Sequence, residues 1–470
     1  MTAPSSDYQT WLATLTLGQV SALLREQGCE EGFVKSLAAN NNSKQQIYLA
    51  SDLVQVSRLP SGDPIASSGS SDKPGAKDKK KFQCAVEFRW MTPNGPRRAP
   101  NAKLIYYPQY PEVRFSGLLA GCDDPPSFLL NRELRGAEVG RTLILAPNQN
   151  DEVFGFVLPP ESIAAKQLWN MKLDQYGVMS VWNFAEDVHE ALPSIFEELC
   201  RINRLGFVDS QRLKKVGPPV PYSAQNGGGY TLEALLGIRP NAKCEPDYQG
   251  WEVKQHGVKN LERSSSGPIT MFTPEPDGGL YNSKGVEFFL RKYGYKRSGD
   301  DNRYDFAGIH KCPNGWNGRS KLRIRVEGYS VGGVEDPDGM IILEGKNGVI
   351  AASWSFEKLL GRWKRKHEQA VFIPSLAKKG KTSQYQFGST VITGTGTSFP
   401  QFLDAVINGT VYYDPGLNLK RKPDGTWQSK KRSQFRTKLR DISVLYDTVS
   451  VVDSCHPVLP SAVGYRDFDH

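Results

Sequence analysis

The chain has 470 residues, 39% of them hydrophobic, which is enough for two or three domains that each bury a core. Its formal net charge of +9 is compatible with a polyanionic partner but lies well below the basicity of ribosomal proteins. No apolar stretch approaches the ~18 residues of a membrane span, and the N-terminus lacks the basic start and apolar run of a signal peptide. The sequence therefore predicts a soluble cytoplasmic protein that makes no membrane contact.

Cysteine usage points to the same compartment. The cysteines form no Cys-x-x-Cys pair and no Cys/His cluster at zinc spacing. The seven are Cys29, Cys84, Cys122, Cys200, Cys244, Cys312 and Cys455. An odd number without a disulfide framework predicts free thiols in a reducing cytoplasm.

Residues 1–165 are predicted to form a β-rich N-terminal domain. Apolar residues at helical spacing predict one helix over residues 8–27. Residues 61–81, "SGDPIASSGSSDKPGAKDKKK", predict a mobile loop because this composition cannot bury apolar surface. Short apolar or alternating runs over residues 82–158, separated by Pro, Gly and Asn, then predict several strands.

Residues 185–455 are predicted to form a second domain of the α/β (α+β) class, with the boundary between residues 160 and 190. The segment 185–206, "AEDVHEALPSIFEELCRINRLG", has the apolar spacing and charge order of a helix. Strand-like "KLRIRVEG" and "GMIILEG" alternate with helix-like "SFEKLLGRWKRKHE" and "SFPQFLDAVING". By contrast, "GSTVITGTGTSF" is glycine-rich but lacks a Walker lysine, and it predicts a loop.

A candidate site lies at residues 246–254, "PDYQGWEVK". In a half-buried strand, Glu252 and Lys254 point the same way while Val253 points into the core. Gly250 can bend the backbone and bring Asp247 back towards them. Two carboxylates at a bend can hold a divalent metal ion, and a lysine beside them can orient a water or stabilise a developing anion. On these nine residues alone, a surface hairpin with a solvated Glu/Lys pair is the simpler alternative.

The preceding segment, "NGGGYTLEALLGI", adds a third carboxylate. Thr231 is a candidate N-cap for a helix that carries Glu233 in an early turn. Asp247 follows Glu233 by 14 residues, and Glu252 follows Asp247 by five. A helix, a loop and a hairpin can therefore bring three carboxylates and Lys254 together, which suits phosphodiester hydrolysis assisted by one or two Mg²⁺ ions.

The segment "GGGYTLEALLGIRPNAKCEPDYQGWEVKQ" resembles the MvaI/BcnI family of restriction endonucleases, relatives of the mismatch-repair nicking enzyme MutH among the PD-(D/E)xK nucleases. The resemblance covers roughly residues 190–450 and includes "ASWSFEKLLGRWKRKHEQAVFI" and "FLDAVINGTVYYDPGLNL". It implies a core with a mixed sheet flanked by helices, and Mg²⁺-dependent cleavage of double-stranded DNA at a specific sequence. It also implies a monomer that serves in defence against foreign DNA, with a cognate DNA methyltransferase as a partner.

The same resemblance assigns roles to four residues. Asp247 and Glu252 match the family's metal-binding carboxylates, and Lys254 matches its catalytic lysine. Glu233 matches the helix carboxylate that supports the metal site or its water.

Five further residues are candidate DNA contacts. The basic segment 420–440 suits backbone phosphates or guanine edges, although such a run can also be a solvated loop. Where the family usually has a His-Gly pair before its Phe-Arg, this chain has "KKRSQFR", with Lys431 and Arg432 instead, while Arg436 still matches the family's arginine. His256 and His310 each either reach DNA or are structural.

The function of the N-terminal domain and of the whole chain stays open to alternatives. Residues 97–117, "RRAPNAKLIYYPQYPEVRFSG", interleave basic and aromatic residues, which fits either nucleic-acid binding or an ordinary β-domain edge. Some restriction enzymes that resemble this family carry an additional DNA-binding domain at this end, so a specificity or effector module is favoured by analogy. The alternatives for the whole chain are a MutH-like nicking repair enzyme and a catalytically inactive DNA-binding subunit of a defence system.

Overall fold

The computed structural model describes residues 6–38, 46–69, 79–131, 140–184, 194–239, 246–261, 267–297, 299–313, 315–331, 333–334, 336–380 and 382–456. The chain divides into a first unit, Met1–Ala191 with the short segment Gly333–Asp338, and a second unit, Leu192–Gly332 with Gly339–His470. Residues 166–184, which the sequence left between two expected domains, thus belong to the first unit. Within the described ranges, no helix is long and apolar enough to cross a membrane.

Two helices begin the first unit in place of the single helix expected over residues 8–27. They are α1 (Ser6–Thr14) and α2 (Leu17–Arg25). The side chain of Thr16 accepts a hydrogen bond from the backbone N–H of Gln19 at 3.3 Å, and the Gln19 side chain accepts one from the N–H of Thr16 at 2.9 Å. This reciprocal capping box starts a new helix where apolar spacing alone indicated continuity.

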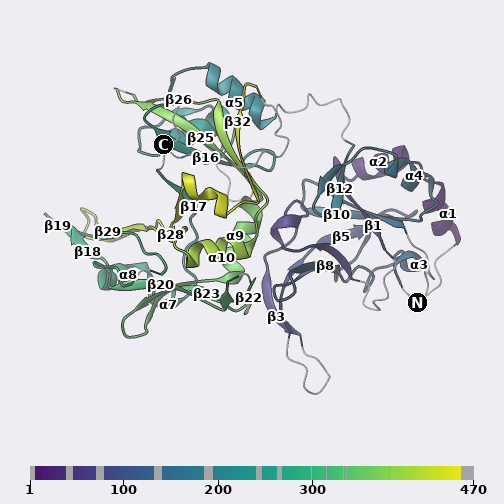
Figure 1. Cartoon of the computed structure of the whole chain (residues 1–470), viewed down its shortest axis with the longest axis horizontal. Helices are drawn as coiled ribbons and strands as arrows, with labels where there is room; N and C mark the ends of the chain where they lie inside the picture. The colour runs from purple at the N-terminus through teal and green to yellow at the C-terminus, as the bar shows by residue number, and fades with distance from the viewer. Residues whose placement is uncertain are drawn as a thin grey trace. The chain divides into compact units, whose positions relative to one another are not determined.

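Two sheets confirm the β-rich character of the first unit (Figure 1). In spatial order, the first consists of β11 (Asp174–Tyr176), β12 (Met179–Asn183), β1 (Glu31–Leu37), β9 (Arg141–Pro147), β10 (Glu152–Leu158), β5 (Glu87–Trp90) and β6 (Arg97–Arg98). The second consists of β2 (Ile47–Ala50), β8 (Glu112–Ser116), β7 (Lys103–Tyr107), β4 (Lys79–Ala85) and β3 (Ile65–Gly69). Short helices η1 (Val54–Val56), α3 (Ser127–Leu130) and α4 (Ile163–Trp169) complete the unit. Phe88 packs edge-on against Trp90 and Phe115, and all three are buried.

The prediction of a mobile loop over residues 61–81 is wrong at both ends of that range. Strand β3 pairs antiparallel with β4, from Ile65 opposite Gln83 to Gly69 opposite Lys79. Backbone pairing of this kind depends on the neighbouring strand and is invisible in composition. The middle of the predicted loop, residues 70–78, lies outside the described residues.

Within residues 97–117, the structure separates the interleaved basic and aromatic side chains. Tyr106 and Phe115 are 1% exposed and belong to the core, whereas Tyr110 is 53% exposed. Arg114 forms an ion pair with Glu112 at 2.7 Å. Part of the pattern therefore arises from the buried face of two strands, as the ordinary β-domain alternative holds.

A mixed sheet forms the centre of the second unit. Its strands, in spatial order, are β13 (Val208–Asp209), β26 (Gln384–Phe387), β25 (Gln369–Lys378), β27 (Thr390–Thr395) and β32 (Thr448–Asp453), with β16 (Glu252–Val258) added parallel to β25. Helix α5 (Ile195–Arg204) lies against this sheet (Figure 1). Its Leu199 and Ile202 share a core with Val371 and Ile373 of β25.

The second unit also contains smaller sheets and further helices. The sheets are β14 (Gln211–Arg212) with β15 (Val220–Pro221); β17 (Pro268–Phe272), β31 (Phe435–Lys438) and β28 (Tyr412–Tyr413); β18 (Tyr295–Arg297), β19 (Asp300–Ala307), β29 (Gly416–Arg421) and β30 (Trp427–Lys430); and β20 (Leu322–Glu327), β23 (Met340–Gly345) and β24 (Ile350–Ser355). The helices are α6 (Gly227–Leu235), α7 (Gly279–Ser283), α8 (Gly285–Tyr293), α9 (Phe356–Lys366), α10 (Phe399–Ile407) and η2 (Leu439–Val444). The predicted mixed α/β class is confirmed.

Three local expectations in the second unit need correction. The helix expected over residues 185–206 is described only as Ile195–Arg204, and residues 185–193 lie outside the described ranges. Helix α6 begins at Gly227, so Thr231 is not its N-cap; the Thr231 hydroxyl instead donates to the backbone oxygen of Gly227 at 2.7 Å within the helix. The segment expected to be a loop at "GSTVITGTGTSF" contains strand β27, because its residues pair on both sides with β25 and β32.

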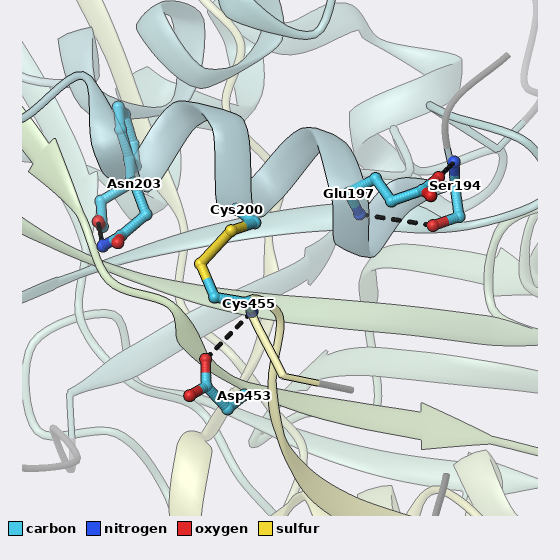
Figure 2. Close-up of a disulfide and its surroundings, with 7 residues drawn as sticks. Ser194, Glu197, Cys200, Asn203, Asp453 and Cys455 are labelled. Atoms are coloured by element: carbon cyan, nitrogen blue, oxygen red, sulfur yellow. Dashed lines mark hydrogen bonds between the residues drawn. A yellow bond between two sulfur atoms is a disulfide. The ribbon is translucent and has the colours of Figure 1, made fainter. Parts of the chain in front are cut away.

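The expectation that all cysteines are free thiols is wrong for one pair. Cys200 of α5 and Cys455, which follows β32, form a disulfide across 255 residues of sequence (Figure 2). Spacing along the chain gives no sign of this pair, because only the packing of α5 beside the end of β32 brings the two residues together. Cys29, Cys84, Cys122 and Cys312 form no disulfide, and Cys244 lies outside the described residues.

Candidate active site

Strand β16 places two of the candidate residues. It runs parallel to β25, with Glu252 opposite Ala370 and Lys254 opposite Phe372. Val253 belongs to the buried core, as the alternation of a strand requires. Glu252 and Lys254 therefore lie on the same side of β16, where Glu252 is only 2% exposed.

A tight bend returns Asp247 to the start of this strand. Gln249 and Gly250 have φ values of 45° and 82°, and Tyr248 bridges to Trp251. The left-handed conformation at Gly250 is one that glycine adopts without a steric penalty. The bend lets the Asp247 Oδ2 accept a hydrogen bond from the backbone N–H of Val253 at 3.0 Å, which fixes this carboxylate beside Glu252.

Helix α6 brings the third carboxylate within electrostatic range. Burial, followed by the charge of Asp247, raises the pKa of Glu233 from 4.5 to about 7. Burial and the charge of Glu252 likewise raise the pKa of Asp247. Burial, reinforced by repulsion from the neighbouring carboxylates, therefore favours proton uptake by Glu233 near neutral pH.

Two lysines offset this negative charge at Glu252. The Lys254 Nζ donates to the Oε1 of Glu252, and the Lys366 Nζ lies 3.2 Å from the Oε2. Lys366 is also 3.8 Å from the Oδ1 of Asp247. Burial acts to raise the pKa of Glu252, but the two ammonium groups outweigh it and hold the pKa below its usual value.

Lys366 is the residue that the sequence did not reveal. It ends α9, where Lys364, Arg365 and Lys366 follow one another. The neighbouring His367 is completely buried; its ring stacks on Trp363 with 4.1 Å between centroids. This stacking anchors the end of α9, so that Lys366 is directed to Glu252. The basic run was a visible signal, but it could not indicate which of its members faces the carboxylates.

The donor set fits a magnesium ion held by two carboxylates. Among the described residues, no three His, Cys, Asp or Glu side chains form a metal-ligand group. Mg²⁺ is commonly bound through one or two carboxylates and completes its shell with waters and substrate phosphates. Asp247 and Glu252 supply hard oxygen ligands beside a site with excess negative charge, so these residues fit that mode of binding.

The candidate DNA contacts are distributed differently. His256 lies on the same face of β16 as Lys254, and burial lowers its pKa to about 4, which leaves it neutral at pH 7. His310 is 3% exposed, and its Nε2 lies 2.7 Å from the hydroxyl of Ser320. The buried, hydrogen-bonded position of His310 argues against the expected DNA contact.

The basic candidates at the C-terminal end occupy β31 and the segment before it. Lys431 and Arg432 are exposed. The Arg436 guanidinium donates to the Oδ2 of Asp414 at 2.7 Å and to the backbone oxygen of Pro268 at 2.9 Å. Arg436 is therefore held in a fixed orientation.

One protein family and two solved structures are similar to the chain. The model of the MvaI/BcnI restriction endonuclease family matches residues 196–446, more than half of the chain. The chain belongs to this family. The solved complex of restriction endonuclease MvaI with its cognate DNA substrate is 16% identical, covers 55% of this chain and 96% of that chain, and has a TM-score of 0.42. For MvaI in the absence of DNA, the identity is 14%, the coverage is 55% and 95%, and the TM-score is 0.31. No curated protein sequence matches the chain.

The family match encloses every candidate residue named above. It begins within α5 and ends at Tyr446, two residues before β32 begins. Membership therefore makes the second unit a nuclease of the restriction endonuclease type. Of the first unit, Met1–Ala191 lies outside the match, whereas the short segment Gly333–Asp338 lies inside it.

Proposed function

We propose that the chain is a Mg²⁺-dependent endonuclease that hydrolyses phosphodiester bonds in double-stranded DNA at a specific sequence, in defence against foreign DNA. The observation that carries this proposal is the convergence of Asp247, Glu252 and Lys254, with Glu233 near enough that the charge of Asp247 adds to the effect of burial and its pKa rises to about 7. Family membership supplies the reaction type.

The metal site would be formed by Asp247 and Glu252. Bound Mg²⁺ supplies charge neutralisation at the scissile phosphate and lowers the pKa of a coordinated water. The Asp247 carboxylate is preorganised for this role by its hydrogen bond to the backbone of Val253. Glu252 is preorganised by contacts with Lys254 and Lys366 on its two oxygens.

Lys254 and Glu233 would handle the proton and the developing charge. The side chain of Lys254 is 18% exposed, so its ammonium group can donate to a water or to a phosphate oxygen of bound DNA. A carboxylate with a pKa of about 7 is poised to accept a proton from the attacking water. As expected for this family, cleavage would leave a 5′-phosphate on one fragment and a 3′-hydroxyl on the other.

A supercoiled plasmid assay tests the proposal directly. The wild-type protein should give linear DNA with Mg²⁺ and none with EDTA, and Asp247→Asn should give neither nicked nor linear product. Accumulation of nicked circles as the end product would favour the MutH-like alternative. Binding without any cleavage by the wild-type protein, across metal ions and plasmid sequences, would favour an inactive DNA-binding subunit.

Two finer parts of the proposal concern partners. We expect a monomer that cuts the two strands in turn, which light scattering during cleavage tests. We expect a cognate DNA methyltransferase, so plasmid methylated in the recognition sequence should resist cleavage. The first unit is proposed to act as a specificity or effector module.

A further inference from the structure

The sheet formed by β18, β19, β29 and β30 has two faces with different surroundings. Leu417 and Leu419 of β29 are buried on one face. On this side, Arg291 of α8 lies over the rings of Trp427 and Tyr304, at 4.5 and 5.6 Å from their centroids. Alternate residues of the same strands must therefore point to the opposite face.

Strand register gathers polar residues on that opposite face. Arg303 of β19 is opposite Lys420 of β29, which in turn is opposite Gln428 of β30. In the next row, Asn418 is opposite Lys430. Arg303 lies more than 100 residues before its neighbours in the chain, so the sequence did not connect it with the basic C-terminal segment.

These residues line a hollow of about 480 Å³ on the outside of the sheet. The lining consists of Arg303, Asn418, Lys420, Gln428 and Lys430 of this face, together with Ser429, which is opposite Leu419 in the strand register. Asp305, two residues from Arg303 on β19, accepts a hydrogen bond from the Nε of Arg303 at 2.7 Å. Lys420 and Lys430 are both exposed, so the face remains positively charged.

The chemistry of this lining selects one kind of partner. Lysine, arginine, asparagine, glutamine and serine are the side chains that commonly donate to DNA phosphates. The lining contains none of the aromatic rings on which the bases of a single strand stack. Three cations with no aromatic ring among the lining residues therefore fit the phosphates of a duplex better than a single-stranded segment.

We propose that this face of the β19–β29–β30 ribbon binds the phosphate backbone of duplex DNA and supplies affinity that is independent of base sequence. The inference rests on the proposed function, because it assigns an additional contact surface to the same substrate. Within the basic segment 420–440, Lys420 and Lys430 face the hollow, and the other basic residues do not. Arg421 is exposed but continues the row of Leu417 and Leu419, so it lies on the face that does not line the hollow.

The test is the salt dependence of DNA binding by the full-length protein, measured by fluorescence anisotropy in the cleavage-deficient Asp247→Asn background. Lys420→Ala and Lys430→Ala should each reduce the slope of log Kd against log salt concentration by about 0.9, the value for one lost phosphate contact. The slope should fall by the same amount on a duplex that contains the cleaved sequence and on a duplex in which that sequence is scrambled. Arg421→Ala is the matched control, since it removes the same charge one residue away and should leave the slope unchanged.

Several results would overturn the inference. Equal effects of Lys420→Ala and Arg421→Ala would mean that general charge, and not this face, is responsible. A loss confined to the cleaved sequence would indicate contacts with base edges instead of the backbone. Lys420→Gln and a thermal unfolding scan guard against misfolding, because a folded Gln variant should repeat the effect of Ala. If the wild-type protein cleaves and the Lys variants bind normally, this inference alone fails; if the wild-type protein neither cleaves nor binds duplex DNA, the proposed function fails with it.

Discussion

The Lys366 Nζ lies 3.2 Å from the Oε2 of Glu252, although the two residues are 114 positions apart in the chain. The other oxygen of Glu252 accepts a hydrogen bond from Lys254. A nearly buried carboxylate thus has an ammonium group on each oxygen, and one of them comes from a helix that the sequence motif does not include. Charge balance at the candidate active site therefore depends on the end of α9.

Lys366→Ala should lower the rate of DNA cleavage by at least about tenfold, which corresponds to about 1.4 kcal/mol of lost transition-state stabilisation. The reason is that Glu252 and Asp247 lose a neutralising charge and their defined orientation. Lys366→Arg should restore part of the rate, and Arg362→Ala, an exposed cation one turn earlier on α9, should have little effect. Equal rates for wild type and Lys366→Ala at saturating Mg²⁺ and at limiting Mg²⁺ would exclude a role at the site.

Asp247→Asn should lower the rate of DNA cleavage by several orders of magnitude, while the protein should still fold and bind DNA. An asparagine retains an oxygen that can accept the hydrogen bond from Val253, so the substitution removes the charge alone. Asp247→Ala should be equally inactive and should also lose about 1 kcal/mol of unfolding free energy through the missing hydrogen bond. Cleavage rates and chemical denaturation of both variants check this prediction, and a folded, active Asn variant would remove Asp247 from the metal site.

Glu233→Gln should stabilise the metal-free protein at pH 8 but not at pH 4. The pKa of Glu233 is about 7 in the folded protein against 4.5 ordinarily, so the folded state holds the proton more tightly than the unfolded state. Below pH 4.5 both states are protonated and the difference vanishes; as the pH rises towards 7, ionisation favours unfolding by up to about 3 kcal/mol. Glutamine does not ionise and escapes this cost.

The measurement for Glu233→Gln is the difference in melting temperature between variant and wild type from pH 4 to pH 8. Added Mg²⁺ should shrink the difference at pH 8, because a bound cation relieves the repulsion among the three carboxylates. Cleavage should fall and should require more Mg²⁺. A pH-independent difference in melting temperature would show that Glu233 ionises normally.

Reduction of the Cys200–Cys455 disulfide should destabilise the second unit. The bond closes a loop of 255 residues, for which chain entropy gives about 5 kcal/mol, a value that residual structure in the unfolded state will reduce. Thermal unfolding with and without a phosphine reductant measures the effect. Cys200→Ser should match the reduced wild type and should not respond to reductant, whereas Cys122→Ser, at a free cysteine, should behave as wild type. Alkylation that finds six or seven free thiols in the native, unreduced protein would contradict the pairing.

A fragment that begins near Ala185 should retain metal-dependent cleavage, because the family match and all four candidate catalytic residues lie within it. Removal of the first unit should then alter DNA affinity or site choice more than the chemical step. The separate first unit should bind DNA at low salt without cutting it. A folded but inactive C-terminal fragment, or a first unit without affinity for any duplex, would contradict this division of labour.

Local spacing was sufficient to predict the motif itself. Alternation along a strand places Glu252 and Lys254 on one face, and Gly250 permits the bend that returns Asp247, so these relationships span only eight residues. The β-rich first unit and the mixed α/β second unit were also predictable, since patterns of apolar residues repeat within single elements. Helix ends were less predictable, as at Thr16 and Thr231, because a cap depends on one hydrogen bond that competes with several alternatives.

Which distant segments share a surface could be seen only in the folded protein. The sequence determined the three carboxylates and the lysine of the motif, because their order and spacing act through the local backbone. It could not determine that Lys366 faces Glu252, that Cys200 meets Cys455, that His310 is buried, or that Arg303 joins Lys420 and Lys430 on one face of a ribbon. Each of these depends on strand pairing and helix packing between segments ten to more than 200 residues apart, and packing is decided by the burial of the whole core rather than by any local pattern.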